Sequence, residues 1–231
     1  MRKRVPRSSS ELNSKKDFRI MSTNVDALLT TSPVMPVLVI ERVEDAVPLA
    51  EALKAGGLKV LEVTLRTDSA IDVIKEIADK VDDVIVGAGT VTKPEEFQQV
   101  QAVGGMFAIS PGATDALFKA GLESDMPYLP AISSVAEMMR GMEFGFEAFK
   151  FFPAEAAGGP KMLKAISGPF PQVRFCPTGG INENNFTDYL SLPSVSVVGG
   201  SWVVPTDLID SKDWAGITKL ASDAVAKASA L

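Results

Sequence analysis

The sequence predicts a single-domain α/β protein with a (β/α)8 (TIM) barrel, and two observations carry this prediction. Short apolar segments recur from Met35 onward at intervals of roughly 20 to 26 residues, and each interval leaves room for one helix and two short loops. No change of composition marks a linker in this part of the chain. Because strands that alternate with helices form parallel sheets, the pattern favours the barrel, with an open doubly wound sheet as the alternative. The expected strands lie within 35–40, 59–66, 84–91, 105–112, 126–133, 148–154, 174–180 and 195–202.

The segments between these strands carry the start signals of helices. Asp68 and Ser69 precede an amphipathic segment that ends near residue 80, and Pro94 begins the next helical segment. Ser134, followed by Glu137, forms the pattern of a capping box at the start of a third helix. These signals place helices where the alternation requires them.

The composition limits the chemistry that the chain can perform. Of 231 residues, 46% are hydrophobic and 23% are charged, which is ordinary for a globular enzyme. The chain has no histidine and one cysteine, Cys176, which excludes an internal disulfide, a histidine-based triad and the usual zinc site; we expect no metal and no cofactor. An apolar run of about 18 residues and a secretory leader pattern are both absent, which predicts a cytoplasmic protein without membrane contacts.

The amino terminus differs from the rest of the chain in charge. Residues 1–20 carry seven basic and two acidic side chains, whereas the whole chain has a net charge of −6. We expect 1–20 to be a disordered basic extension, Met21 to be the natural start, and 21–231 to form the barrel. The acidic body argues against nucleic-acid binding.

Strand alternation in the segment 59–66 predicts polar side chains inside the barrel. The leucines and the valine of LEVTL face the helices, while Glu62, Thr64 and Arg66 point inward. A parallel strand that is buried on both faces is normally apolar, so an inward glutamate and arginine need an explanation. They form either a structural ion pair or part of a polar site.

Lys150 lies inside the apolar run AFKFF, and the same alternation turns it inward together with Ala148 and Phe152. At its ordinary pKa of about 10.4, a lysine is only about 0.1% neutral near neutral pH, and burial lowers the pKa because desolvation disfavours the ammonium. The functional interpretation is a Schiff-base lysine. The alternative is a structural salt bridge between Lys150 and Glu62.

Two glycine-rich turns follow the seventh and eighth expected strands, at 176–181 (CPTGGI) and 198–202 (VGGSW). Glycines there let backbone N–H groups approach an anion closely, and phosphate commonly binds at this position in eight-stranded barrels. The turn 87–90 (GAGT) lacks the third glycine of a dinucleotide fingerprint, and we interpret it as delivering the Thr90 hydroxyl to the same site. Cys176 is expected to be a core residue, since no base candidate stands beside it.

Together these residues resemble the class I 2-keto-3-deoxy-6-phosphogluconate (KDPG) aldolases of the Entner-Doudoroff pathway, many of which also cleave 4-hydroxy-2-oxoglutarate. The resemblance covers residues of about 26 to 230 and departs from the family pattern at no motif position. The motifs that carry it are LEVTLRT, VGAGTV, AISPG, FKFFPAE, RFCPTGGI and GGSW.

The resemblance implies roles for the residues identified above. Lys150 is expected to form the Schiff base, Glu62 to act as general acid and base, and Arg66 and Thr90 to bind the substrate carboxylate. The distal phosphate is expected to be bound by Thr178, Gly179, Gly180, Gly199, Gly200 and Ser201. The family is commonly a homotrimer and needs no metal. The alternative functions are a phosphosugar isomerase or epimerase without a covalent intermediate, and a non-catalytic phosphometabolite-binding protein.

Overall fold

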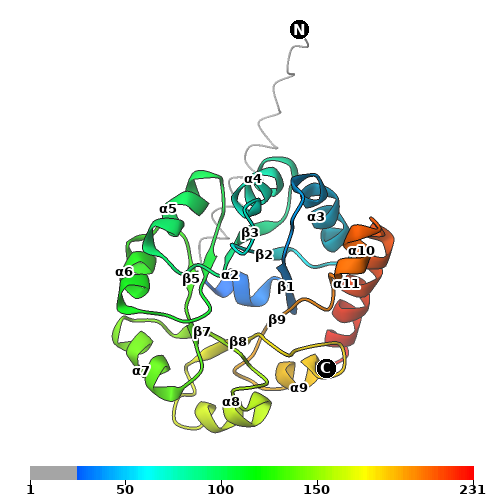
Figure 1. Cartoon of the computed structure of the whole chain (residues 1–231). Coiled ribbons are helices and arrows are strands. Elements are labelled where there is room, and N and C mark those ends of the chain that lie inside the picture. Colours follow the sequence, from blue (N-terminus) through cyan, green and yellow to red (C-terminus); the bar gives the residue numbers. More distant parts are fainter. Residues whose placement is uncertain (1–24) are drawn as a thin grey trace, which may run out of the picture.

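The computed structural model describes residues 25–231, so the expected basic extension 1–20 and the proposed start at Met21 lie outside the described residues. Strands lie at the centre with helices around them (Figure 1). The strands are β1 Val34–Leu38, β2 Val60–Thr64, β3 Ile85–Gly89, β4 Ala108–Ile109, β5 Tyr128–Leu129, β6 Ala131–Ile132, β7 Ala148–Phe151, β8 Arg174–Pro177 and β9 Val198–Gly200. The helices are α2 Val25–Thr30, α3 Ala46–Ala55, α4 Ala70–Lys80, α5 Pro94–Ala102, α6 Asp115–Glu123, α7 Val135–Glu143, α8 Gly159–Ser167, α9 Phe186–Leu190, α10 Thr206–Asp210 and α11 Trp214–Ala228, with a 3-10 turn at Val43–Asp45.

The strands form two parallel sheets, which confirms the predicted single-domain α/β architecture. One sheet has the order β5-β4-β3-β2-β1-β9, and the other has the order β6-β7-β8. In the first sheet Glu62 pairs with Val37 on one side and with Gly87 on the other. In the second sheet Lys150 pairs with Ala131 and Cys176. Every segment predicted to be a strand contains one.

The fifth predicted strand is divided into β5 and β6 by Pro130. Proline has no backbone N–H, so it interrupts the ladder of hydrogen bonds. Its carbonyl oxygen still accepts a hydrogen bond from the Lys150 amide at 2.9 Å. The interruption therefore removes one backbone hydrogen-bond donor, and the chain still continues alongside β7 as β6.

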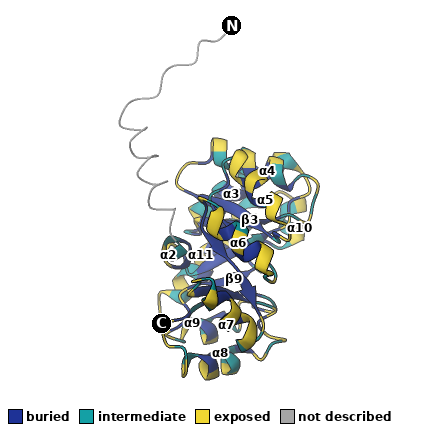
Figure 2. Cartoon of the chain, turned by 90° about the vertical axis from the view of Figure 1, so that its left-hand side faces the viewer, coloured by how far each residue is buried: buried dark blue, intermediate teal, exposed yellow. Residues whose placement is uncertain are grey.

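The strands bury both of their faces, and each face contributes to a different apolar cluster. Leu61, Val63, Phe149 and Phe151 belong to the large cluster between the strands and the helices, as the alternation predicts. A smaller cluster lies inside the sheets and consists of Leu28, Leu29, Met35, Val60, Ile85, Phe107, Ile109, Leu129, Ala148, Cys176 and Val197. Figure 2 shows the dark-blue buried strands enclosed by helices whose outer faces are exposed.

Helix α2 fills the interior at one end, a role that the sequence patterns did not indicate. The Leu28 and Leu29 residues are at most 1% exposed. They pack with Met35 and Val60, which lie at or near the amino-terminal ends of their strands. The opposite, carboxyl-terminal ends of the strands carry the polar residues described below.

The predicted helix starts agree with the structure except in one detail. Pro94 is the first residue of α5, and Ser134 and Glu137 form the capping box of α7. Ser69 precedes α4 but makes no capping bond. Its hydroxyl donates instead to the Ile40 carbonyl at 2.7 Å, because that oxygen lies beyond the end of the neighbouring strand and within reach.

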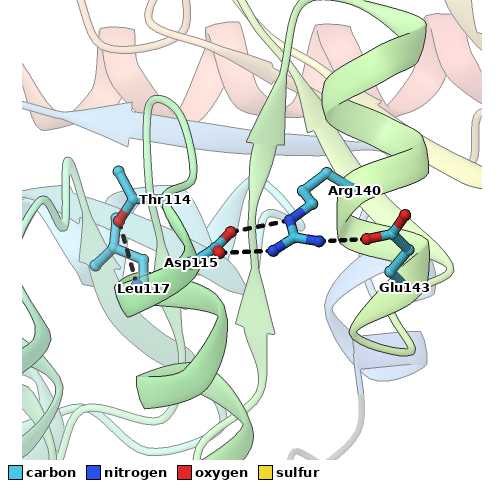
Figure 3. A network of polar contacts seen from close by, with 5 residues as sticks. All are labelled: Thr114, Asp115, Leu117, Arg140 and Glu143. Carbon is cyan, nitrogen blue, oxygen red and sulfur yellow. Dashed lines mark hydrogen bonds and ion pairs between the residues drawn. The ribbon is translucent and has the colours of Figure 1, made fainter.

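Helices α6 and α7 are joined by Arg140, which lies between Asp115 and Glu143 (Figure 3). The Arg140 Nε and Nη2 groups donate to the two carboxylate oxygens of Asp115 at 3.0 and 2.6 Å, and Nη1 donates to Glu143. These hydrogen bonds, which stabilise the charged carboxylate, lower the pKa of Asp115 below its ordinary value.

In residues 25–231 no helix is long and apolar enough to cross a membrane.

The Asp115–Arg140 pair predicts an acid-dependent loss of stability. Since the folded protein lowers the pKa of Asp115, the pair stabilises the native state above the ordinary pKa of aspartate, and this contribution is lost as the pH falls through the lowered pKa. In urea denaturation between about pH 7 and about pH 3, Asp115→Asn should remove this part of the pH dependence. Arg140→Gln should remove the same part. Profiles that keep the wild-type slope in both variants would contradict the assignment.

Candidate active site

Lys150 and Glu62 form a buried ion pair across the interior of the molecule. The Lys150 Nζ donates to the Glu62 Oε1 at 2.8 Å, although the two residues are 88 positions apart in the chain. Lys150 comes from β7 in the three-stranded sheet and Glu62 from β2 in the six-stranded sheet. Their side chains are only 7% and 1% exposed. The inward orientations predicted from strand alternation therefore bring the two groups into direct contact.

The second carboxylate oxygen of Glu62 accepts no hydrogen bond. Among the described residues, Glu62 Oε2 is the one buried side-chain nitrogen or oxygen without a partner. Buried polar atoms are nearly always hydrogen-bonded, and leaving one without a partner costs free energy. An unused acceptor beside a buried lysine is typical of a group that acts on a ligand.

A glycine in β3 leaves room for the Glu62 carboxylate. Gly89 pairs with Thr64 in the sheet. A Cβ atom at position 89 would lie 2.6 Å from Glu62 Cγ and 2.7 Å from Glu62 Cδ, which is closer than real Cβ contacts allow. Gly89 is therefore required by the size of the site, and this explains one glycine of the GAGT segment.

Arg66 and Thr90 lie just beyond the carboxyl-terminal ends of the adjacent strands β2 and β3. The Arg66 Nε donates to the Thr64 hydroxyl at 3.2 Å, and that hydroxyl donates to the Leu38 carbonyl at 2.9 Å. Within residues 25–231 the Arg66 guanidinium makes no ion pair under 4.0 Å. It is thus held from one side, with its two terminal nitrogens available for a carboxylate.

Thr90 has an unusual backbone conformation. Its φ angle is 59°, in the left-handed region, which a β-branched residue rarely adopts. Such strain costs on the order of 1–3 kcal/mol and is found mainly at functional sites. The strained position follows β3 directly, at the same edge of the sheet as Arg66.

The two glycine-rich turns lie side by side. Thr178, which follows β8, pairs with Gly199 in β9. A side chain at position 199 would collide with the Thr178 hydroxyl, so the pairing requires glycine. Gly179 and Gly180 have φ angles of 103° and 79°, which glycine adopts without strain. Ser201 is exposed at the end of the second turn, and Gly200 lies under the Trp202 ring.

Cys176 is a core residue, as expected. It is 1% exposed and belongs to the inner apolar cluster, next to Lys150 in the neighbouring strand. Burial raises the pKa of its thiol to about 12, and the Lys150 charge opposes this shift only in part. A thiol of this kind is a poor nucleophile.

Within the described residues, no group of three acidic or cysteine side chains could hold a metal ion.

Two residues beside the turns were not identified from the sequence. The Tyr189 hydroxyl on α9 donates to the Glu155 Oε1 in the loop after β7. Glu155 belongs to the FKFFPAE motif, and Tyr189 is one of only two tyrosines in the chain. The available signal was a tyrosine on a short apolar segment, which predicts burial but does not identify its partner.

Comparison with known proteins identifies the family of the chain. Residues 25–220 match the family model described as KDPG and KHG aldolase. A 2-dehydro-3-deoxy-phosphogluconate aldolase of Pseudoalteromonas atlantica is 54% identical over 216 residues, covering 94% of this chain and 99% of the relative. A KHG/KDPG aldolase of Escherichia coli is 56% identical over 203 residues, covering 88% and 95% of the two chains.

A solved structure is similar in both sequence and fold. The KDPG aldolase of Legionella pneumophila, with pyruvate captured at low pH as a covalent carbinolamine intermediate, superimposes with a TM-score of 0.85 at 54% identity. The match covers 86% of this chain and 97% of the other. These relatives are aldolases, and on their similarity the chain is an enzyme of the lyase class. The chain belongs to the KDPG and KHG aldolase family.

The buried ion pair predicts an asymmetry in stability between two variants. Lys150→Met should lower the free energy of unfolding by about 3 kcal/mol, because it leaves the Glu62 carboxylate buried without a charged partner. Lys150→Met combined with Glu62→Leu removes both charges and should recover much of that loss. Urea denaturation measures both. Equal losses would indicate that packing around Lys150, and not the uncompensated charge, sets the stability.

Proposed function

We propose that the protein is a class I aldolase that cleaves 2-dehydro-3-deoxy-6-phosphogluconate to pyruvate and glyceraldehyde 3-phosphate, and 4-hydroxy-2-oxoglutarate to pyruvate and glyoxylate. The observation that carries this proposal is the 2.8 Å contact between Lys150 and Glu62, both buried, with one Glu62 oxygen unused. The names of the relatives and the pyruvate carbinolamine in the Legionella enzyme support it.

Lys150 acts as the nucleophile in this proposal. Glu62 accepts a proton from the Lys150 ammonium through their existing hydrogen bond, and the free amine attacks the C2 ketone of the substrate. Glu62 returns this proton to the carbinolamine hydroxyl, which leaves as water, so that a protonated imine forms on Lys150 and Glu62 is again a carboxylate. The alternation of side chains along β7 points the amine into the interior, where the Phe152 ring centroid lies 5.7 Å from the Lys150 ammonium.

Glu62 then serves as the base for cleavage. It takes the proton of the C4 hydroxyl while the C3–C4 bond breaks and its electron pair moves into the imine. The aldehyde leaves and an enamine remains. Glu62, or a water that it holds, protonates C3, and hydrolysis of the imine releases pyruvate and restores Lys150. The carboxylate takes these steps because the chain contains no histidine.

The two ends of the substrate are bound by different parts of the site. We assign the carboxylate to Arg66, whose guanidinium is fixed by Thr64 on one side, and to Thr90. We assign the distal phosphate to Thr178, Gly179, Gly180, Gly199, Gly200 and Ser201. The pairing of Thr178 with Gly199 supports this assignment because it holds both turns at one edge of the sheets.

The proposal includes a closed (β/α)8 barrel formed by the two sheets, within one catalytic unit over 21–231. Two isolated parallel bridges, Phe175 to Val195 and Thr178 to Gly199, support continuity between β8 and the segment of β9. At the other junction, β5 and β6 are one strand divided by Pro130. We further propose that the enzyme is a homotrimer, as is common in this family. We also propose that it is cytoplasmic and needs no metal.

Reductive trapping tests the covalent mechanism. Incubation with pyruvate and sodium borohydride should give a reduced pyruvyl adduct on Lys150, identified by peptide mass mapping, because only an imine is reduced and trapped. Lys150→Ala should abolish both the adduct and turnover. Lys164→Ala, which changes an exposed lysine on α8, is the matched control and should retain both. A fully active Lys150→Ala enzyme would overturn the mechanism.

Ser201→Ala tests the phosphate assignment. It should raise KM for the phosphorylated substrate about fivefold and leave KM for 4-hydroxy-2-oxoglutarate within about twofold, because only the former carries the distal phosphate that the hydroxyl is proposed to bind. Steady-state kinetics on both substrates gives the two ratios. Equal effects on the two substrates would remove Ser201 from the phosphate site.

A further inference from the structure

We propose that Tyr189 is a positioning residue that holds the Glu155 carboxylate away from the Gly179–Gly180 turn and thereby keeps this turn open for the substrate phosphate. The inference rests on the proposed function, since it takes the turn as the phosphate site. It assigns a role to a partly buried hydrogen bond that the reaction steps do not use.

Glu155 lies against the turn. Its amide donates to the Gly179 carbonyl at 3.1 Å, and the preceding Ala154 amide donates to the Thr178 carbonyl at 2.8 Å. A Cβ atom at position 180 would lie 2.7 Å from the Cβ and Cγ of Glu155. The loop after β7 and the turn after β8 are therefore in direct contact, and the Glu155 side chain covers one face of Gly180.

This placement brings a negative charge to a proposed anion site. The turn has no lysine or arginine of its own, so its attraction for phosphate comes from backbone N–H groups and a hydroxyl. A carboxylate that is free to move could accept those same N–H groups, and it would repel a phosphate bound there. Binding therefore requires that the Glu155 carboxylate be held in another direction.

Tyr189 supplies that restraint. Its side chain is completely buried, and its hydroxyl donates to Glu155 Oε1. Burial first, and then the neighbouring carboxylate, raise the pKa of Tyr189, so the hydroxyl is protonated and can donate near neutral pH. Gly159 lies beside this contact, where a Cβ atom would be 3.4 Å from the hydroxyl and 3.5 Å from the carboxylate.

The same short helix also fixes the turn itself. Asn185, the residue before α9, donates through Nδ2 to the Gly180 carbonyl at 3.1 Å and accepts the Asn182 amide at 2.8 Å. Helix α9 thus orients the Gly180 peptide through Asn185 and restrains the nearby charge through Tyr189. A hydrogen bond that served packing alone would not need a partner beside the site.

The test compares Tyr189→Phe with Tyr128→Phe on the phosphorylated substrate and on 4-hydroxy-2-oxoglutarate. Tyr189→Phe should raise KM for the phosphorylated substrate about fivefold with kcat retained, while KM for 4-hydroxy-2-oxoglutarate changes by less than about twofold. Tyr128 is the matched control, because it is also buried and bonds Ser110 at 2.6 Å, away from the turn. Its variant should show no preference between the substrates.

Two further variants separate restraint of charge from general packing. Adding Glu155→Gln to Tyr189→Phe removes the unrestrained charge and should return KM for the phosphorylated substrate to within about twofold of the wild type. Glu155→Asp keeps the charge but shortens the exposed side chain, so it should reproduce the selective rise in KM even if Tyr189→Phe does not fold. Equal effects of Tyr189→Phe on both substrates, or no recovery in the double variant, would overturn the inference.

Ser201→Ala, measured in parallel, distinguishes the two levels of the argument. If Ser201→Ala discriminates between the substrates and neither Tyr189→Phe nor Glu155→Asp does, the role of Tyr189 is wrong and the phosphate site stands. If none of the three discriminates, the phosphate assignment fails, and the inference fails with it.

Discussion

The contact between Lys150 and Glu62 is the interaction to which most of the interior is adapted. Placing an ammonium and a carboxylate inside an apolar protein costs several kcal/mol per ion, and the mutual attraction offsets this cost only when the geometry is good. At 2.8 Å the geometry is good for one carboxylate oxygen, and the other oxygen is left without a partner. Stability alone would favour an apolar pair. The proposed Schiff-base reaction would account for the two charges and for Gly89, which leaves room for the Glu62 carboxylate.

The rest of the interior separates a packed end from a reactive end. At the amino-terminal ends of the strands, Leu28 and Leu29 of α2 fill the space between the sheets together with Met35, Val60 and other apolar side chains. Polar residues, Arg66, Thr90 and Thr178, lie just beyond the carboxyl-terminal ends of β2, β3 and β8. These apolar side chains keep water out of the amino-terminal end of the interior. Electrostatic interactions around Lys150 are therefore stronger than they would be in a hydrated cavity. The division also lets the loops vary without disturbing the core.

The sequence predicts features that depend on local period and leaves open those that depend on distant partners. The inward orientation of Glu62 and Lys150 follows from the two-residue repeat of a strand, and the helix starts at Pro94 and Ser134 follow from short-range rules. The hydrogen bond of Ser69 to Ile40 depends on which strand lies alongside, which the local pattern does not encode. The Tyr189–Glu155 contact joins helix α9 to the loop after β7, and neither residue carries a recognisable motif for it.

The proposed anion site shows how an acidic chain can bind an acidic substrate. With a net charge of −6 and no basic side chain in either glycine-rich turn, long-range attraction cannot supply the affinity. Backbone N–H groups act only over short distances, so they bind an anion without drawing every anion to the surface. Such a site is sensitive to any nearby carboxylate, because its attraction comes from partial charges. This sensitivity is the reason for proposing that Glu155 is restrained, and a site built on lysine or arginine would depend on such a restraint less.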